Sequence, residues 1–161
     1  MATDPTTAPV ASMSTRAIDS FLEERGFGTI AFGSEEGGYA VPMSFGYDRS
    51  NQRCLFQFIS HDDSRKQAYL ERSNRVSLSV YEWNGIDDWR SVVLHGSLSE
   101  LPEDEHHAAA VTFAANATPI SLGIFPGPAN ELSFSWHELR ISEKTGRRAN
   151  PVANTLEESP E

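Results

Sequence analysis

Short runs in which hydrophobic and polar residues alternate cover most of the chain. Such alternation is typical of β-strands with one buried face. The runs lie at residues 27–32, 39–47, 53–60, 74–83, 89–101 and 131–141. Turn-forming residues separate several of them, for example Ser-Glu-Glu-Gly-Gly at residues 34–38. We therefore predict about six short strands, with consecutive strands paired antiparallel.

One of these runs predicts a central strand. In residues 53–60, Cys54, Phe56 and Phe58 alternate with Leu55, Gln57 and Ile59, so that both faces are largely apolar. A strand at the margin of a sheet would show one polar face. We therefore expect residues 53–60 to be covered on both sides.

Helical periodicity occurs in two or three places. Ser14 can cap a helix whose apolar face is formed by Ile18, Phe21 and Leu22 and which ends at Gly26. Residues 102–117 begin with acidic residues and continue with alanines, as expected of a helix, and residues 64–72 predict a third helix. The predicted fold class is mainly β: a small antiparallel barrel of six strands, with two or three helices packed outside it.

The two ends of the chain lack this patterning. Residues 1–13 are rich in Thr, Ala and Pro, and residues 149–161 are polar and acidic, so we expect two flexible tails. Residues 14–148 would then form one compact domain, which suits a length of 161 residues.

The chain is acidic, with 23 Asp and Glu residues against 13 Lys and Arg residues and a formal net charge of −10. This balance argues against nucleic acid as a partner, because neutralising phosphates requires clustered basic residues. Lys66 and Lys144 are the only lysines, and an acidic surface poor in lysine is typical of proteins kept soluble in high salt. We therefore hypothesise a halophilic source.

The location of the protein is suggested by two features that the sequence lacks. No apolar run approaches the roughly 20 residues needed to span a bilayer, and the first residues do not have the pattern of a secretory signal, so we expect no membrane association. Cys54 is the only cysteine, which excludes a disulfide framework and favours the reducing cytoplasm.

Residues 60–66 form a local exception to the acidity. A predicted strand ends at Ser60, and a predicted helix begins near Arg65 and Lys66. The N-terminus of a helix exposes backbone N–H groups that bind anions, and the hydroxyls of Ser60 and Ser64 would add donors. Arg can chelate two phosphate oxygens, and Lys adds a point charge. A phosphate pocket is therefore the favoured interpretation, and an ordinary capped helix with a basic first turn is the alternative.

These motifs also carry a family resemblance. Phe58-Ile59-Ser60, followed by Ser64-Arg65-Lys66 and then Arg75-Val76-Ser77-Leu78, resembles the pyridoxamine 5′-phosphate oxidase-like, FMN-binding split-barrel family. The stretches VPMSFGYD at 41–48 and WRSVVLHG at 89–96 fit the same pattern in the right order. Together the motifs cover residues 27 to about 101.

The resemblance implies a six-stranded antiparallel split barrel that forms a homodimer, with FMN bound in two equivalent clefts between the subunits. In the family, residues matching Arg65 and Lys66 hold the FMN phosphate, helped by the position of Ser60. The strand matching residues 41–45 lines the isoalloxazine ring and hydrogen-bonds it through its backbone, and the position of Ser91 reaches the flavin from the partner subunit. The expected cofactor-binding residues are Val41, Pro42, Met43, Ser44, Phe45, Ile59, Ser60, Ser64, Arg65, Lys66 and Ser91.

Two departures separate the chain from the true pyridoxamine-phosphate oxidases. Ala40 and Phe45 stand where those enzymes have basic residues, and the C-terminal Arg-Leu-His-Asp-Arg type of motif is absent from the sequence. The resemblance therefore implies a shorter, general flavin-binding member, an oxidoreductase that uses a small-molecule electron donor or acceptor. No catalytic residue follows from the sequence. Two alternatives stay open: a flavin carrier or sensor without turnover, and the same fold binding deazaflavin F420 or haem.

Other candidate residues carry weaker signals. His106 and His107 are adjacent in a predicted helix and do not share a face, so no metal site is predicted. Cys54 has no identifiable base beside it and suits a core position better than a nucleophile. Trp83 and Trp89 flank a turn and could line a flavin cleft, a dimer interface or the core.

Replacing both Arg65 and Lys66 with alanine tests the predicted phosphate pocket. Each charge-assisted hydrogen bond contributes roughly 1.5–3 kcal/mol, so the double variant should weaken FMN binding by several kcal/mol. Calorimetric titration of both proteins with FMN measures this difference. An unchanged affinity would show that the phosphate is bound elsewhere.

Overall fold

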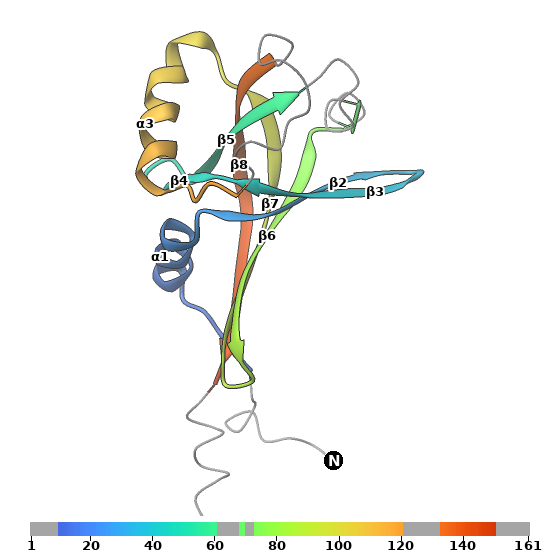
Figure 1. The fold of residues 1–161 in the computed structure, drawn as a ribbon. Helices are drawn as coiled ribbons and strands as arrows, with labels where there is room; N and C mark the ends of the chain where they lie inside the picture. Colours follow the sequence, from blue (N-terminus) through green and yellow to red (C-terminus); the bar gives the residue numbers. More distant parts are fainter. Residues whose placement is uncertain (1–9, 61–67, 70–72, 121–132, 151–161) are drawn as a thin grey trace, which may run out of the picture.

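The computed structural model describes residues 10–60, 68–69, 73–120 and 133–150 (Figure 1). Within these residues the chain forms eight β-strands, two α-helices and one short 3₁₀-helix. In chain order they are β1 (Val10–Ser12), α1 (Thr15–Arg25), β2 (Phe27–Ser34), β3 (Gly37–Ser44), β4 (Gly46–Asp48), β5 (Arg53–Ser60), β6 (Arg75–Gly85), β7 (Asp88–Glu100), η2 (Glu103–Glu105), α3 (His106–Asn116) and β8 (Ser133–Ala149).

The strands form one antiparallel sheet in the order β3-β2-β6-β7-β8-β5-β4, and β1 pairs with the end of β8. The two ends of this order, β3 and β4, follow one another in the chain with only Phe45 between them. The sheet therefore curls back on itself. Since the described parts of β3 and β5 approach each other without pairing, the barrel is open between them. The fold is the antiparallel split β-barrel that we predicted. The predicted pairing of consecutive strands is wrong between β5 and β6, because β6 pairs with β2 and β5 pairs with β8.

The helices and the long strands give the molecule its shape. Figure 1 shows α1 and α3 on the same side of the barrel and the β2–β3 hairpin extending away from them. Strands β6, β7 and β8 continue past the barrel as a long ribbon, and β1 lies at the end of that ribbon (Figure 1). Among the described residues, no helix is long and apolar enough to cross a membrane.

The alternating pattern of β6 and β7 separates an inner from an outer face. The register pairs Leu78 with Leu94 and Val80 with Val92, and all four side chains are buried in the core. The intervening residues point to the opposite side of the sheet, which we call the outer face. Strand β5 is covered on both faces, as predicted. Cys54, Phe56 and Phe58 join the main core, and Leu55 packs with Leu101 and Ala109 beneath α3.

The first helix has the boundaries that its capping residues predict. The Ser14 hydroxyl accepts a hydrogen bond from the backbone N–H of Ala17 at 3.1 Å. Gly26 ends the helix with a φ of 65°, a left-handed conformation that favours glycine. The predicted second helix is also confirmed, as η2 followed by α3. The predicted helix at 64–72 lies outside the described residues apart from 68 and 69, which are helical.

The strand count is eight rather than six for two reasons. The single strand predicted at 39–47 is divided at Phe45, whose backbone N–H donates to the carbonyl oxygen of Gly26 at 2.9 Å instead of to a strand. In addition, Val10–Ser12, which we assigned to the N-terminal tail, pairs with 147–149 of β8.

The last strand is also longer than predicted, since β8 continues to Ala149 instead of ending at Ile141. The alternation that marks a strand disappears because two of its inward positions are not apolar. Lys144 lies opposite Leu94 and binds Asp19, and Gly146 lies opposite Val92. A hydrophobic pattern therefore could not reveal this part of the strand.

A polar cluster ties α1 to β4 and β8. Asp19 is buried, and one of its carboxylate oxygens accepts hydrogen bonds from the Tyr47 hydroxyl at 2.6 Å and from the Lys144 ammonium at 2.7 Å. Gln52 completes the cluster by donating to Tyr47 and accepting from Lys144. Burial raises the pKa of Asp19, but the hydrogen bonds from Lys144 and Tyr47 outweigh it, and the pKa lies below its usual value of 3.8.

Replacing Asp19 with asparagine should lower the free energy of unfolding by about 3 kcal/mol, since Lys144 would keep its largely buried position without an anion. Urea denaturation measures the change. The matched control is Glu23→Gln on the same helix, which breaks an ion pair to Arg49 whose side chains are both 42% exposed and should cost less than about 1 kcal/mol. Equal effects of the two substitutions would contradict a structural role for the buried pair.

The same cluster predicts a dependence of stability on pH. A carboxyl whose pKa is lowered by folding stabilises the folded state above its unfolded pKa, and this contribution disappears as the pH falls through the folded pKa. The wild-type protein should therefore lose stability below about pH 4, and Asp19→Asn should show a weaker pH dependence in that range. Urea denaturation at pH 7 and near pH 3 tests this, and parallel curves would contradict it.

Candidate functional site

The strand expected to line a flavin lies at the edge of the sheet. Among the described strands β3 pairs only with β2, so its ladder hydrogen bonds occupy one side of the backbone. Met43 and Phe45 are buried in the core, and Val41 packs against it. Pro42 and Ser44 point to the outer face. What this strand can offer a ligand is therefore the backbone of its free edge and the side chain of Pro42.

Two hydrogen bonds hold the segment after α3 against this strand. The Ser44 hydroxyl donates to the carbonyl oxygen of Thr118 at 2.6 Å and accepts from the backbone N–H of Ile120 at 3.2 Å. Ser44 is thus occupied by the protein itself. Its role in the structure is to place Ile120 beside Pro42.

The expected phosphate end is described only in part. The backbones of Ile59 and Ser60 end β5, opposite Phe134 and Ser133 of β8. Ser64, Arg65 and Lys66 lie outside the described residues. Tyr69 follows shortly after them in the sequence and stacks on Tyr39 of β3, with ring centroids 5.5 Å apart. This contact places Tyr69 against the β2–β3 hairpin.

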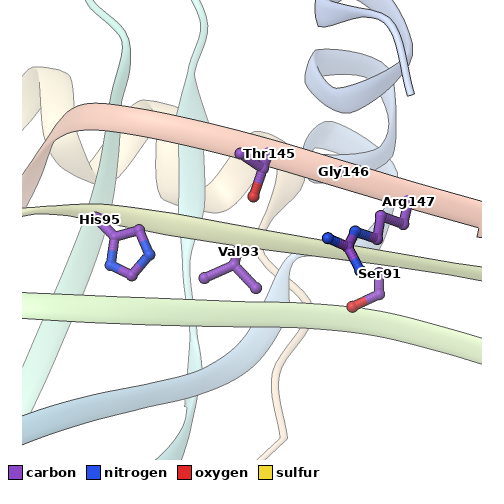
Figure 2. Close-up of a pocket in the computed structure, with 6 residues that line it drawn as sticks. All are labelled: Ser91, Val93, His95, Thr145, Gly146 and Arg147. Carbon is purple, nitrogen blue, oxygen red and sulfur yellow. The ribbon is translucent and has the colours of Figure 1, made fainter. Parts of the chain in front are cut away.

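Ser91 lies in a separate hollow on the outer face, shown in Figure 2. Ser91, Val93 and His95 of β7 and Thr145, Gly146 and Arg147 of β8 line a space of about 340 Å³. Figure 2 shows the Arg147 guanidinium beside Ser91 and the His95 ring at the other end of the row. A nitrogen of that ring, Nδ1, lies 2.8 Å from the Ser77 hydroxyl oxygen.

Strand order sets the distance between the two groups of expected site residues. The register runs across the outer face from Pro42 to Thr29, Ser79 and Val93. Three strand spacings separate β3 from β7, which is about 14 Å at a spacing of ~4.8 Å. The fold therefore keeps Ser91 away from residues 41–45 of the same chain.

A second hollow of about 240 Å³ adjoins Pro42. Arg25, Phe27, Thr29, Pro42, Tyr81 and Ile120 are among its lining residues. Tyr81 lies opposite Ser91 in the β6–β7 register, so the two hollows are neighbours. Sequence reasoning missed Arg25, because a basic residue in the last turn of a helix already interacts favourably with the helix dipole and carries no signal of a ligand.

The structure also places the other candidate residues, Cys54, His106 and Trp83. Cys54 is fully buried in the core, and burial raises the pKa of its thiol. His106 lies 3.0 Å from the carbonyl oxygen of Leu101, and no group of three or more potential metal ligands occurs among the described residues. Trp83 is 63% exposed, so the core alternative for it is wrong.

The fold and the candidate site describe a split-barrel protein with a free strand edge, and the sequence shows the family to which this protein belongs. A sequence model of the pyridoxamine 5′-phosphate oxidase family matches residues 14–148. The chain therefore belongs to this family. None of the curated proteins matches it.

Several solved structures share the fold. A FAD-binding protein from Mesorhizobium loti is 21% identical with a TM-score of 0.70, and the alignment covers 89% of this chain and 100% of that one. A FAD-binding protein from Mycobacterium smegmatis is 15% identical with a TM-score of 0.63, covering 87% and 98%. A FAD and haem binding protein from the same organism is 14% identical with a TM-score of 0.61, covering 92% and 80%. At these identities the likeness concerns the fold.

The placement of Phe45 in the core leads to a prediction. Phe45→Ala should lower the free energy of unfolding by about 3–5 kcal/mol, as expected when a large buried side chain is removed. Pro42→Ala on the exposed side of the same region should cost less than about 1 kcal/mol. Both are measured by urea denaturation without added ligand. A stable Phe45→Ala protein would place this side chain outside the core.

Proposed function

We propose that this protein binds FMN along the free edge of β3 and acts as a homodimeric, flavin-dependent oxidoreductase. The observation that carries the proposal is the unpaired edge of β3 beside the opening of the barrel, in a member of the pyridoxamine 5′-phosphate oxidase family. The names of two similar structures, both FAD-binding proteins, support a flavin as the ligand.

The donor and acceptor groups of β3 suit the flavin ring. The pyrimidine edge of an isoalloxazine carries alternating N–H and C=O groups, and a free strand edge presents a matching row. Because the side chains of Met43 and Phe45 are committed to the core, the backbone of residues 41–45 would make these hydrogen bonds. Two donors are missing from this row, since Pro42 has no backbone N–H and the N–H of Phe45 is donated to Gly26. Pro42 would face the ring from the outer side.

The phosphate would lie at the other end of the opening. The proposal assigns it to Ser60, Ser64, Arg65 and Lys66, with Ile59 on the adjoining end of β5. The stacking of Tyr69 on Tyr39 supports this assignment, since it places Tyr69, which follows Lys66 closely in the sequence, beside β3.

The separation of Ser91 from β3 argues for a homodimer. A ring bound at the free edge of β3 lies beyond the reach of Ser91 in the same chain, because β2 and β6 stand between them. A second copy packed on the outer face could bring its own Ser91 to the flavin. The small and polar residues of that face, such as Thr29, Ser77 and Ser79, leave room for close packing.

The chemistry of the proposed activity belongs to the cofactor. When bound, a flavin supplies transfer of hydride or single electrons through its N5. The chain's own residues would bind and orient the ring and shape the space for a small-molecule donor or acceptor. A haem protein is the second candidate, because one of the similar structures is named as binding both FAD and haem.

Purified protein tests the proposal directly. We expect an oxidised-flavin absorption spectrum, or its appearance on adding FMN, with one FMN per chain and a dimer by analytical ultracentrifugation. Flavin released by heat and separated by chromatography distinguishes FMN from FAD. A colourless protein that binds neither, or one with a haem spectrum, would contradict the proposal.

The same preparation tests turnover. Reduction of the bound flavin by NADH or NADPH, followed by reoxidation with small-molecule acceptors, is the result expected of an oxidoreductase. A flavin that none of these donors reduces would instead support a carrier or sensor.

A further inference from the structure

The hollow beside Pro42 is lined by a cation, Arg25, that has no hydrogen-bonded anion among the described residues. Arg25 is partly buried, and its Nε is the one fully covered side-chain nitrogen or oxygen in the described part of the chain that lacks a hydrogen-bond partner. Its guanidinium carbon lies 4.3 Å from the centroid of the Phe27 ring. Because this Nε has no exposed surface, a ligand in the hollow would have to bind the terminal nitrogens of the guanidinium.

The acidic residues nearby are committed to another arginine. Arg90 binds Glu82 through Nη2 at 2.5 Å and Nε at 3.2 Å, and it also lies 3.5 Å from Glu24. Glu82 is close enough to Arg25 to feel its charge, but its hydrogen bonds go to Arg90 and Asn84. Arg25 therefore lines the hollow without a hydrogen bond to either of these carboxylates.

The other walls of the hollow are apolar and partly aromatic. Phe27 and Tyr81 contribute rings, and Pro42 and Ile120 contribute aliphatic surface. Its volume of about 240 Å³ lies below the roughly 300–1,000 Å³ typical of pockets for drug-sized ligands. These walls suit a small, planar, apolar body that carries one negative charge.

We propose that this hollow binds a small aromatic carboxylate, with the carboxylate on Arg25 and the ring against Phe27 and Tyr81. A guanidinium holds a carboxylate through paired, charge-assisted hydrogen bonds, and aromatic walls favour a flat ring over an aliphatic chain. Binding of the carboxylate follows from the hollow itself. Its role as the reaction partner of the flavin rests on the proposed function, because Pro42 lies on the strand to which we assign the ring.

Benzoate is the probe, and benzyl alcohol, which carries the same ring and no charge, is its neutral counterpart. Both are titrated by calorimetry into the full-length protein, with and without FMN. We expect benzoate to bind at least tenfold more tightly than benzyl alcohol. Arg25→Gln should remove this preference, and Arg16→Gln, an exposed arginine on the same helix, should preserve it.

The outcomes separate this proposal from the flavin proposal. FMN binding is followed by its own absorption, so a protein that fails to bind FMN but binds benzoate through Arg25 would refute the flavin assignment and keep the carboxylate site. Equal binding of benzoate and benzyl alcohol, or benzoate binding unchanged in Arg25→Gln, would overturn the carboxylate site. A loss of FMN affinity in Arg25→Gln with benzoate binding unaffected would assign Arg25 to the flavin and would also overturn it.

Wild-type protein provides a test that does not depend on the folding of a variant. Nuclear Overhauser effects from the benzoate ring protons should reach the rings of Phe27 and Tyr81, which line the hollow. Contacts confined to the Ser91 hollow, to Val93 or Thr145 for example, would place the ligand at the wrong site and overturn the proposal.

Discussion

The carbonyl oxygen of Gly26 is the point on which the arrangement of the barrel depends. It accepts hydrogen bonds from the backbone N–H groups of Phe45 at 2.9 Å and of Thr118 at 3.0 Å. It thereby joins the end of α1, the junction of β3 with β4 and the segment after α3. A Cβ atom at this position would lie 2.4 Å from the carbonyl oxygen of Asn116, so glycine is required by space as well as by its positive φ.

This junction determines both how the sheet curls into a barrel and where the barrel stays open. Because the N–H of Phe45 is given to Gly26, the chain bends there, and its two flanking strands become the two edges of the sheet. Asn116 secures the second edge by accepting from the N–H of Tyr47 and donating to its carbonyl oxygen. The free edge of β3 is thus a consequence of closure, and it is the feature on which the proposed flavin site rests.

The two faces of the sheet have different physical roles. The inner face is occupied by large apolar side chains such as Leu78 and Leu94, which stabilise the fold by their burial. The outer face carries several small or polar residues beside Pro42, Tyr81 and Val93, and its two neighbouring hollows meet at the pair Tyr81 and Ser91. We therefore propose ligand recognition and packing of a second copy for the outer face, which does not contribute to the core.

Much of the fold could be predicted from the sequence, because local patterns report local burial. The capped helix from Ser14 to Gly26 and the doubly apolar strand at 53–60 both occur where the pattern places them. The hydrophobic pattern did not predict the end of β8, because Lys144 is a polar residue at an inward position. Its ion pair with Asp19, on a helix distant in the sequence, stabilises it there. Of the candidate site, the motif residues could be named in advance, but Arg25 could not.

The sequence by itself determined which residues alternate, where helices begin and end, and the order of the family's motifs, since each of these depends on neighbours in the chain. The tertiary structure alone decided that Met43 and Phe45 face the core, that Ser91 lies far from β3, and that Arg25 lines a hollow with no hydrogen-bonded anion among the described residues. These properties depend on which strands become neighbours and where the sheet closes. Contacts between residues distant in the chain set them, and no local pattern encodes those contacts.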